Sequence, residues 1–317
     1  MNRVLVIGHH GMLGSALMEL LREEGLRLEE VRPGAPDASS PTPQACFAGA
    51  DLPEVDITDR ASVQRLLDGF RPDLVINCAA YTRVDDAESD REEAMRVNAE
   101  GAGNVASAAC ASGAKLVHIS TDFVFDGLKS APYVETDEPY PLSVYGQSKL
   151  EGERLVARAA KDHLIVRTAR LYGRGGRNFV TTIINLAREK PELTVVDDQR
   201  GSPTWTRDLS RAIWELCNAD ARGIVHAAGG PSCSWYEFAV EIVRQAGLKT
   251  CVRPITSWEW VAGFVGVRDD AGEPKYPAVR PANSALDTSL LSRLTGFEFP
   301  TWQDSLARFL EEWCASR

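Results

Sequence analysis

The sequence lacks the patterns that mark several large classes of protein. It contains no run of about 18 apolar residues, so no transmembrane helix is predicted. Its seven cysteines are odd in number and scattered, without a C-x-x-C pair, which argues against a disulfide framework and a structural zinc site. Repeats and coiled-coil heptads are missing as well. These absences favour an ordinary globular protein that works in a reducing compartment.

Positive charge is also scarce. Lys and Arg number 35 against 45 for Asp and Glu, a net charge of -10, so nucleic acid and anionic membranes are not expected as partners. Any anionic ligand must therefore be held by local groups. The apolar run at residues 4–7 is too short for a signal peptide, and we expect a cytoplasmic protein.

Short runs rich in β-branched residues alternate with amphipathic stretches along the first two thirds of the chain. Such runs predict buried parallel strands at residues 4–7, 26–31, 73–77, 115–120, 163–168 and 223–228. Helical patterns fall at residues 15–24, 62–70, 92–112, 235–246 and 302–315. This alternation predicts the α/β class, with a Rossmann-type doubly wound parallel sheet.

The 317 residues favour about two domains. We expect an NAD(P)-binding Rossmann domain of residues 1–172 plus about 203–230. About 173–202 plus 231–317 would form a smaller α+β substrate-binding lobe. Residues 33–50, rich in Pro, Ala and Ser, are interpreted as an irregular surface loop after the second strand.

A glycine triplet, Gly8, Gly11 and Gly14, directly follows the first predicted strand and opens the first helix. Glycines there permit a tight turn, close approach of a pyrophosphate and close helix packing, while the helix N-terminus supplies N–H donors. At the end of the second strand an acidic side chain would favour NAD and an arginine NADP. Arg32 at this place favours NADPH. Glu30 is the alternative residue for the contact with the ribose, and NADH is the alternative cofactor.

A phenol and an amine, Tyr145 and Lys149, lie four residues apart and hence on one face of a predicted helix. An adjacent ammonium would lower the pKa of the phenol and make it a usable proton donor. Thr121 follows a strand of the same predicted sheet, where its hydroxyl could bond the substrate oxygen that Tyr145 protonates. The turn that contains Asp56 and Ile57 predicts a helix start, and could also touch the adenine.

Together these segments resemble the dTDP-4-dehydrorhamnose reductase family of extended short-chain dehydrogenases/reductases. The similar segments run nearly end to end: GHHGMLG at 8–14, DLVINCAAYTRVDDAESD at 73–90, VNAEGAGNVA at 97–106, HISTDFVFDG at 118–127, PLSVYGQSKLEGE at 141–153, NFV at 178–180, DDQRGSPTW at 197–205 and VRPANSALD at 279–287. The resemblance implies hydride transfer from NADPH or NADH to the 4-keto carbon of a dTDP-linked deoxysugar.

The resemblance also implies roles for individual residues. Tyr145 would be the proton donor, Lys149 would bind the nicotinamide ribose and tune Tyr145, and Thr121 would polarise the keto oxygen. The implied cofactor-binding residues are Gly8, Gly11, Met12, Leu13, Gly14, Arg32, Asp56, Ile57, Cys78, Ala79, Ala80, Tyr81, Asn98, Tyr145 and Lys149. The implied substrate-binding residues are Asp122, Phe123, Arg170, Asn178, Gln199 and Arg280. No metal is expected to be required, and a homodimer is compatible with the resemblance.

Two positions depart from the family pattern. Phe123 stands where tyrosine is common, and Arg170 stands where tryptophan is common. The exact sugar nucleotide is therefore left open. Two other functions remain as alternatives: an epimerase or dehydratase of the same superfamily, and a cofactor-binding regulatory subunit resembling the reductase-like partner of methionine adenosyltransferase.

Overall fold

A computed structural model describes residues 3–29, 45–263 and 276–315. Its centre is a seven-stranded sheet with the strand order β11-β6-β5-β4-β1-β3-β2, and every pairing in it is parallel. The strands are β1 (Arg3–Ile7), β2 (Arg27–Leu28), β3 (Cys46–Ala50), β4 (Leu74–Asn77), β5 (Lys115–Thr121), β6 (His163–Thr168) and β11 (Gly223–His226). The predicted doubly wound α/β fold is confirmed.

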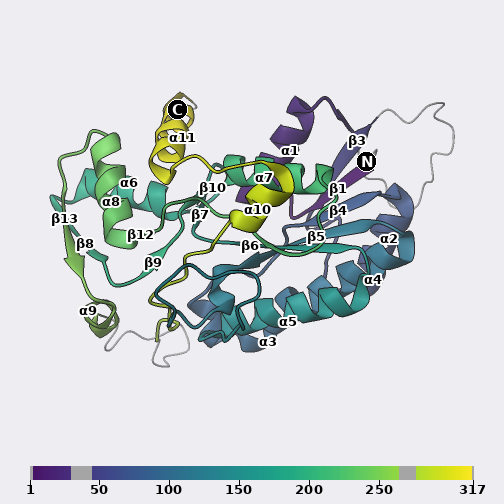
Figure 1. The fold of residues 1–317 in the computed structure, drawn as a ribbon, viewed down its shortest axis with the longest axis horizontal. Coiled ribbons are helices and arrows are strands. Elements are labelled where there is room, and N and C mark those ends of the chain that lie inside the picture. The colour runs from purple at the N-terminus through teal and green to yellow at the C-terminus, as the bar shows by residue number, and fades with distance from the viewer. Residues whose placement is uncertain (1–2, 30–44, 264–275, 316–317) are drawn as a thin grey trace.

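Helices cover both faces of this sheet, as Figure 1 shows. One face packs on α1 (Met12–Glu23), α7 (Thr206–Asn218) and α10 (Ser289–Thr295). The other packs on α2 (Arg60–Phe70), α4 (Ala102–Ser112) and α5 (Val144–Ala159). Strands β1, β4, β5 and β6 are buried on both sides, which explains why they form continuous apolar runs rather than alternating ones.

A second group of elements lies beyond one end of the sheet, on the left of Figure 1. It contains β8 (Glu192–Val196), β12 (Cys233–Ser234), β13 (Cys251–Ile255), α6 (Phe179–Glu189), α8 (Trp235–Gln245), α9 (Ser257–Ala262) and α11 (Trp302–Ala315). Its own apolar core includes Phe238, Phe309 and Tyr172. Short strands link it to the rest: β7 (Leu171–Tyr172) pairs with β10 (Thr204–Trp205), and β9 (Arg200–Gly201) pairs with β12. The division into domains stays a prediction.

The prediction of a loop over residues 33–50 is wrong for its C-terminal part. Residues 46–50 form β3, which pairs in register with β1 over its whole length, and Phe47 is fully buried. The remainder of that segment, residues 33–44, lies outside the described residues. Composition misled the prediction because three of the five residues of β3 are Ala or Gly, which are uncommon in strands.

Two further predicted elements differ in the structure. Within 26–31 the structure describes only the two-residue strand β2, and both residues are exposed at the edge of the sheet. The helix expected over 92–112 is divided into α3 (Arg91–Met95), a π-helical stretch, η2 (Arg96–Gly101), and α4. The remaining short elements are the 3₁₀ turns η1 (Asp86–Glu88) and η3 (Asp122–Val124). Among the described residues, no helix is long and apolar enough to cross a membrane.

The corrected β3 gives a stability prediction. Phe47→Ala should lower the free energy of unfolding by about 3–5 kcal/mol, because it removes a fully buried aromatic side chain and leaves a cavity. Urea denaturation followed by circular dichroism measures the change. Leu128→Ala, at a side chain that is 86% exposed, is the control and should change stability by less than about 0.5 kcal/mol. An equally small effect of Phe47→Ala would contradict the placement of β3.

Candidate active site

The turn between β1 and α1 is built for close backbone approach. Gly8 has a φ of +80°, and a Cβ there would stand 2.6 Å from the Ala79 nitrogen. A Cβ on Gly14 would stand 2.2 Å from the Gly8 carbonyl oxygen, so both positions require glycine. Gly11 is the extended N-cap of α1 and makes no side-chain cap, which leaves N–H groups of the first turn available to a ligand. This is the geometry of an anion-binding helix N-terminus.

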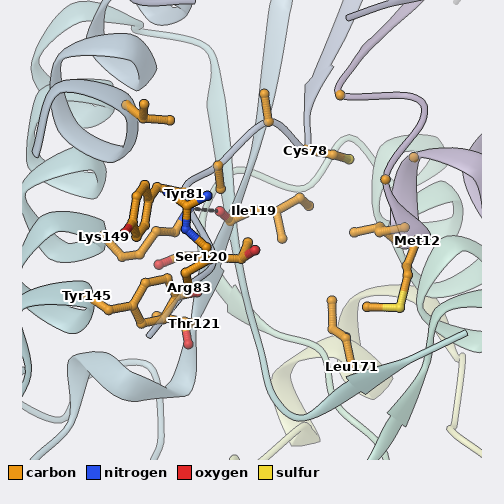
Figure 2. Close-up of a pocket in the computed structure, with 18 of the residues that line it drawn as sticks. Met12, Cys78, Tyr81, Arg83, Ile119, Ser120, Thr121, Tyr145, Lys149 and Leu171 are labelled. Carbon is orange, nitrogen blue, oxygen red and sulfur yellow. Dashed lines mark hydrogen bonds between the residues drawn. The ribbon is translucent and has the colours of Figure 1, made fainter. Parts of the chain in front are cut away.

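A cavity of about 900 Å³ opens from this turn along the carboxyl ends of the strands. Most of the predicted site residues line it: Gly8, Gly11, Met12, Leu13, Gly14, Asp56, Ile57, Cys78, Ala79, Ala80, Tyr81, Thr121, Asp122, Phe123, Tyr145, Lys149, Arg170 and Arg280. Figure 2 shows Tyr145, Lys149 and Thr121 on one side of the cavity and Met12 on the opposite side. The fold thus brings the glycine turn and the Tyr/Lys pair to one space.

Helix α5 carries Tyr145 and Lys149 into this cavity. Its N-cap is Ser143, whose side chain accepts a hydrogen bond from the Gly146 nitrogen. Thr121 ends β5, and its hydroxyl donates to the Asp122 carboxylate at 3.0 Å while accepting from the Phe123 nitrogen at 3.2 Å. These contacts hold the hydroxyl at the end of the strand, beside the cavity.

Burial sets the protonation of the two groups on α5. It raises the pKa of Tyr145 to about 12, against an opposing hydrogen bond from Thr121. It lowers the pKa of Lys149 to about 8, and the ammonium donates to the Ile119 carbonyl at 2.6 Å. The expected lowering of the Tyr145 pKa by Lys149 is therefore wrong for this structure. The phenol keeps its proton at neutral pH, which suits a proton donor.

Asp122 is a buried carboxyl group beside Thr121. Burial raises its pKa to about 6, although Ser284 and Arg170 oppose the shift. Phe123, at the neighbouring position, packs edge-on to Tyr145 with the ring centroids 6.0 Å apart. The phenylalanine thus keeps the aromatic wall that a tyrosine would supply, without the hydroxyl.

Arg170 lies in the left-handed backbone region, with a φ of 45°. Its guanidinium is 4.0 Å from the centre of the Trp235 ring and donates to the carbonyls of Cys233 and Gln199, at 2.9 and 2.8 Å. The planar cation of Arg170 therefore stacks on the Trp235 ring. Trp235, which sequence reasoning missed, also lines the cavity.

Arg280 enters the cavity from the C-terminal part of the chain. It forms an ion pair with Asp85 at 2.9 Å and lies over the Trp260 ring, 4.8 Å from its centre. Its guanidinium also donates to the Ala278 carbonyl at 3.0 Å, and the residue lines the cavity, where a cation suits an anionic ligand.

Three predicted site residues do not appear in the cavity lining. Asn98 binds both backbone groups of Tyr81 and the Ser148 hydroxyl, so it fixes the loop after β4 to α5. Asn178 caps α6 with a capping box. Gln199 is buried and donates to Ser257. Each acts on the scaffold around the cavity in this structure.

The residue at the tip of the strand beside β1 is Asp51, which directly follows β3 and lines the cavity. Its carboxylate accepts from the backbone nitrogens of His10 and Leu52, at 3.2 and 3.0 Å. Arg32 lies outside the described residues. The acidic residue Asp51 after a short apolar run could have identified this position from the sequence, but the composition of residues 33–50 concealed the strand.

His9, His10 and Asp51 form a small cluster beside the glycine turn. One potential ligand atom of each side chain lies within 4.8 Å of those of the other two.

Asp56 and Ile57 line the same end of the cavity as Asp51. The predicted helix start is confirmed: Asp59 caps α2 by accepting from the Ala61 nitrogen. Asp56 accepts from the nitrogen and hydroxyl of Thr58, which fixes the turn. The lining suits a dinucleotide: the glycine turn could hold its pyrophosphate, Asp51 and Asp56 lie where the adenosine would be expected, and Tyr145 and Lys149 are the groups expected near its nicotinamide.

Comparisons with known proteins agree with this geometry. The family model described as RmlD substrate binding domain matches residues 1–314. A dTDP-4-dehydrorhamnose reductase of Aggregatibacter actinomycetemcomitans is 36% identical over 312 residues, 96% of this chain and 97% of that protein. The spore coat polysaccharide biosynthesis protein SpsK of Bacillus subtilis is also 36% identical, over 98% of each chain.

A solved structure agrees as well. The dTDP-4-dehydrorhamnose reductase of Bacillus anthracis, in complex with NADP, superposes with a TM-score of 0.83. It is 37% identical, with 98% of this chain and 99% of that chain covered. Fold and site thus define a sugar-nucleotide oxidoreductase of the extended short-chain dehydrogenase/reductase class. The chain belongs to the dTDP-4-dehydrorhamnose reductase family.

The position of Asp51 gives a binding prediction. Asp51→Asn should raise the affinity for NADPH relative to NADH about tenfold, because it removes a carboxylate that accepts from ribose hydroxyls and repels a 2′-phosphate. Fluorescence titration with each reduced cofactor measures the two dissociation constants. Asp85→Asn, at the Arg280 end of the cavity, is the control and should leave their ratio unchanged. An unchanged ratio in Asp51→Asn would rule out this role.

Proposed function

We propose that the protein reduces the 4-keto group of a dTDP-4-dehydro-6-deoxysugar, with NADPH, the reduced form of the cofactor bound in the Bacillus anthracis relative, as the cofactor and NADH, which Asp51 favours, as the alternative. The substrate would be dTDP-4-dehydrorhamnose, giving dTDP-L-rhamnose, or a close analogue. The observation that carries the proposal is the convergence of Thr121, Tyr145 and Lys149 on one cavity with the glycine turn. The identities of the relatives, 36% over nearly the whole chain, support the substrate class.

The proposed chemistry divides among three side chains. Bound reduced nicotinamide supplies a hydride to the carbonyl carbon. The Tyr145 phenol gives its proton to the carbonyl oxygen, and the Thr121 hydroxyl exchanges its bond to Asp122 for a bond donated to that oxygen as negative charge develops on it. The Lys149 ammonium binds the ribose next to the nicotinamide and offsets the charge left on Tyr145 once its proton has moved.

The sugar nucleotide would occupy the part of the cavity between α5 and the C-terminal part of the chain. Asp122 and Phe123 would flank the sugar, and Arg170 and Arg280 would give the cavity wall positive charge that suits a diphosphate. Two donors of Arg170 are engaged by carbonyls, and two of Arg280 by the Ala278 carbonyl and Asp85, so either arginine would reach a phosphate with its other donors or by exchanging one of these partners.

We further propose that the enzyme works in the cytoplasm on freely diffusing substrates. The scattered, unpaired cysteines support a reducing compartment. The proposal also includes a homodimer as the assembly state.

Tyr145→Phe tests the role of the phenol. The substitution should lower kcat for reduction by about 10²–10⁴-fold, because it removes the proton donor and leaves the aromatic wall. Stopped-flow absorbance at the reduced nicotinamide band, with dTDP-4-dehydrorhamnose, measures the rate. Tyr140→Phe, at a side chain that is 69% exposed and is not among the cavity-lining residues, is the matched control and should keep kcat within about threefold. Turnover by Tyr145→Phe at the wild-type rate would contradict the proposed role of Tyr145.

The pKa of Lys149 predicts the pH dependence of the reaction. Because the lysine acts as an ammonium and burial lowers its pKa to about 8, kcat/KM for reduction should fall as the pH rises through about 8. Tyr145 stays protonated throughout that interval, since its pKa is raised to about 12. A profile measured from pH 6 to 10 shows this fall, whereas a rate that is flat to pH 10 would exclude Lys149 as the titrating group.

A further inference from the structure

A buried ion pair lies directly behind the catalytic residues. Arg167 of β6 donates to both carboxylate oxygens of Glu153 of α5, at 2.9 and 2.7 Å, and the two side chains are 2% and 4% exposed. Arg167 also lies over the Phe125 ring, with 5.1 Å to its centre. Neither charged residue lines the cavity, so neither is a ligand-binding group in this structure. Two charges buried so completely are costly to desolvate, and a hydrophobic pair would often be as stable.

The first connection of this pair to the active site runs through Ser120. The Ser120 hydroxyl donates to Glu153 Oε1 at 2.5 Å, and Ser120 directly precedes Thr121 in β5. In the sheet register Ser120 of β5 is opposite Arg167 of β6, and Glu153 of α5 contacts both. Glu153 therefore fixes the position of Ser120, the residue of β5 that directly precedes Thr121.

The second connection runs to Lys149. Glu153 follows Lys149 by four residues on α5, and so lies on the same face of the helix. The groups that face Lys149 are Tyr145 and Glu153 from its own helix, Cys78 from the end of β4 and His118 from β5. Their charges decide how well the ammonium is stabilised.

Three of these four groups are uncharged at neutral pH. Burial raises the pKa of Cys78 and that of Tyr145 to about 12, and it lowers the pKa of His118 well below its usual value. The carboxylate of Glu153 is the anion of the set. It opposes the effect of burial on Lys149, which would otherwise favour the uncharged amine.

We propose that Glu153, held by Arg167, is a positioning residue of the reductase: it fixes β5 at Ser120 and acts as the counter-charge that keeps Lys149 an ammonium. Arg167 fixes the position of the Glu153 carboxylate with a bidentate contact. In that position the carboxylate accepts from Ser120 and also stabilises the charge of Lys149. The inference rests on the proposed function, because it assigns Lys149 its role as a cation.

The test uses two variants of the full chain. Glu153→Gln preserves shape but leaves the Arg167 charge buried and unpaired, and this single variant can fail to fold. The double variant Glu153→Gln with Arg167→Met removes both charges and keeps a side-chain amide beside Ser120. In both, the fall of kcat/KM at high pH should move to lower pH, by about one unit in the double variant. The shift should be larger in the single variant, where the remaining Arg167 cation repels Lys149.

Glu151→Gln is the matched control on the same helix. Glu151 pairs with Arg154 at the surface, with side chains 32% and 55% exposed, and its loss should leave the profile unchanged. Thermal unfolding of each variant separates stability from ionisation. If Glu153 only supports the fold, the double variant will lose rate equally at every pH and its profile will keep the wild-type midpoint. That result would overturn the inference.

Cofactor binding provides a second measurement that does not depend on turnover. The affinity for NADH without any sugar, followed by fluorescence from pH 6 to 10, should weaken as Lys149 loses its proton, with the same shift between wild type and the double variant. Failure of the proposed function would appear as wild-type protein that binds cofactor but reduces none of the sugar nucleotides. Failure of the inference would appear as identical binding profiles for wild type and the double variant.

Discussion

Parallel pairing of the strands is the constraint on which the site depends. All seven strands of the central sheet run in one direction, so their carboxyl ends meet at one edge. The glycine turn after β1, Cys78 after β4 and Thr121 at the end of β5 are separated by long stretches of sequence, yet they line the same cavity. Helix α5 then packs on the sheet and adds Tyr145 and Lys149. A shared edge, rather than any local motif, brings cofactor and catalytic groups together.

Burial determines the chemistry of the groups at that edge. It keeps the proton on Tyr145 and loosens the proton on Lys149, raising the first pKa to about 12 and lowering the second to about 8. Burial removes water from the Lys149 ammonium. The negative charge of Glu153 and the hydrogen bond to the Ile119 carbonyl partly replace the stabilisation that water would give. In our proposal the Glu153–Arg167 ion pair therefore influences the active site although neither residue lines the cavity.

Features that depend on local spacing were predictable from the sequence. Glycines three residues apart after a strand predict a tight turn into a helix, and a phenol four residues before a lysine predicts that both lie on one helix face. Neither prediction requires the position of the helix in the fold, and the structure brings both groups to the cavity. Strand order is a long-range property. Sequence reasoning took residues 26–31 as the second strand and chose Arg32, which lies outside the described residues. In the structure the strand beside β1 is β3, and the residue that follows it is Asp51. The same limit hid the scaffold roles of Asn98, Asn178 and Gln199, and the direction of the Tyr145 pKa shift depends on burial, which spacing alone does not reveal.

The central claim is that the glycine turn and the Tyr/Lys pair serve one hydride transfer to a 4-keto sugar nucleotide. Reduction of dTDP-4-dehydrorhamnose with a reduced cofactor that carries deuterium at both hydrogen positions of the nicotinamide C4 carbon tests it directly. Mass spectrometry of the isolated product should show one deuterium per molecule, bound at the sugar C4 carbon. A product without deuterium, or with deuterium at another carbon, would contradict the account.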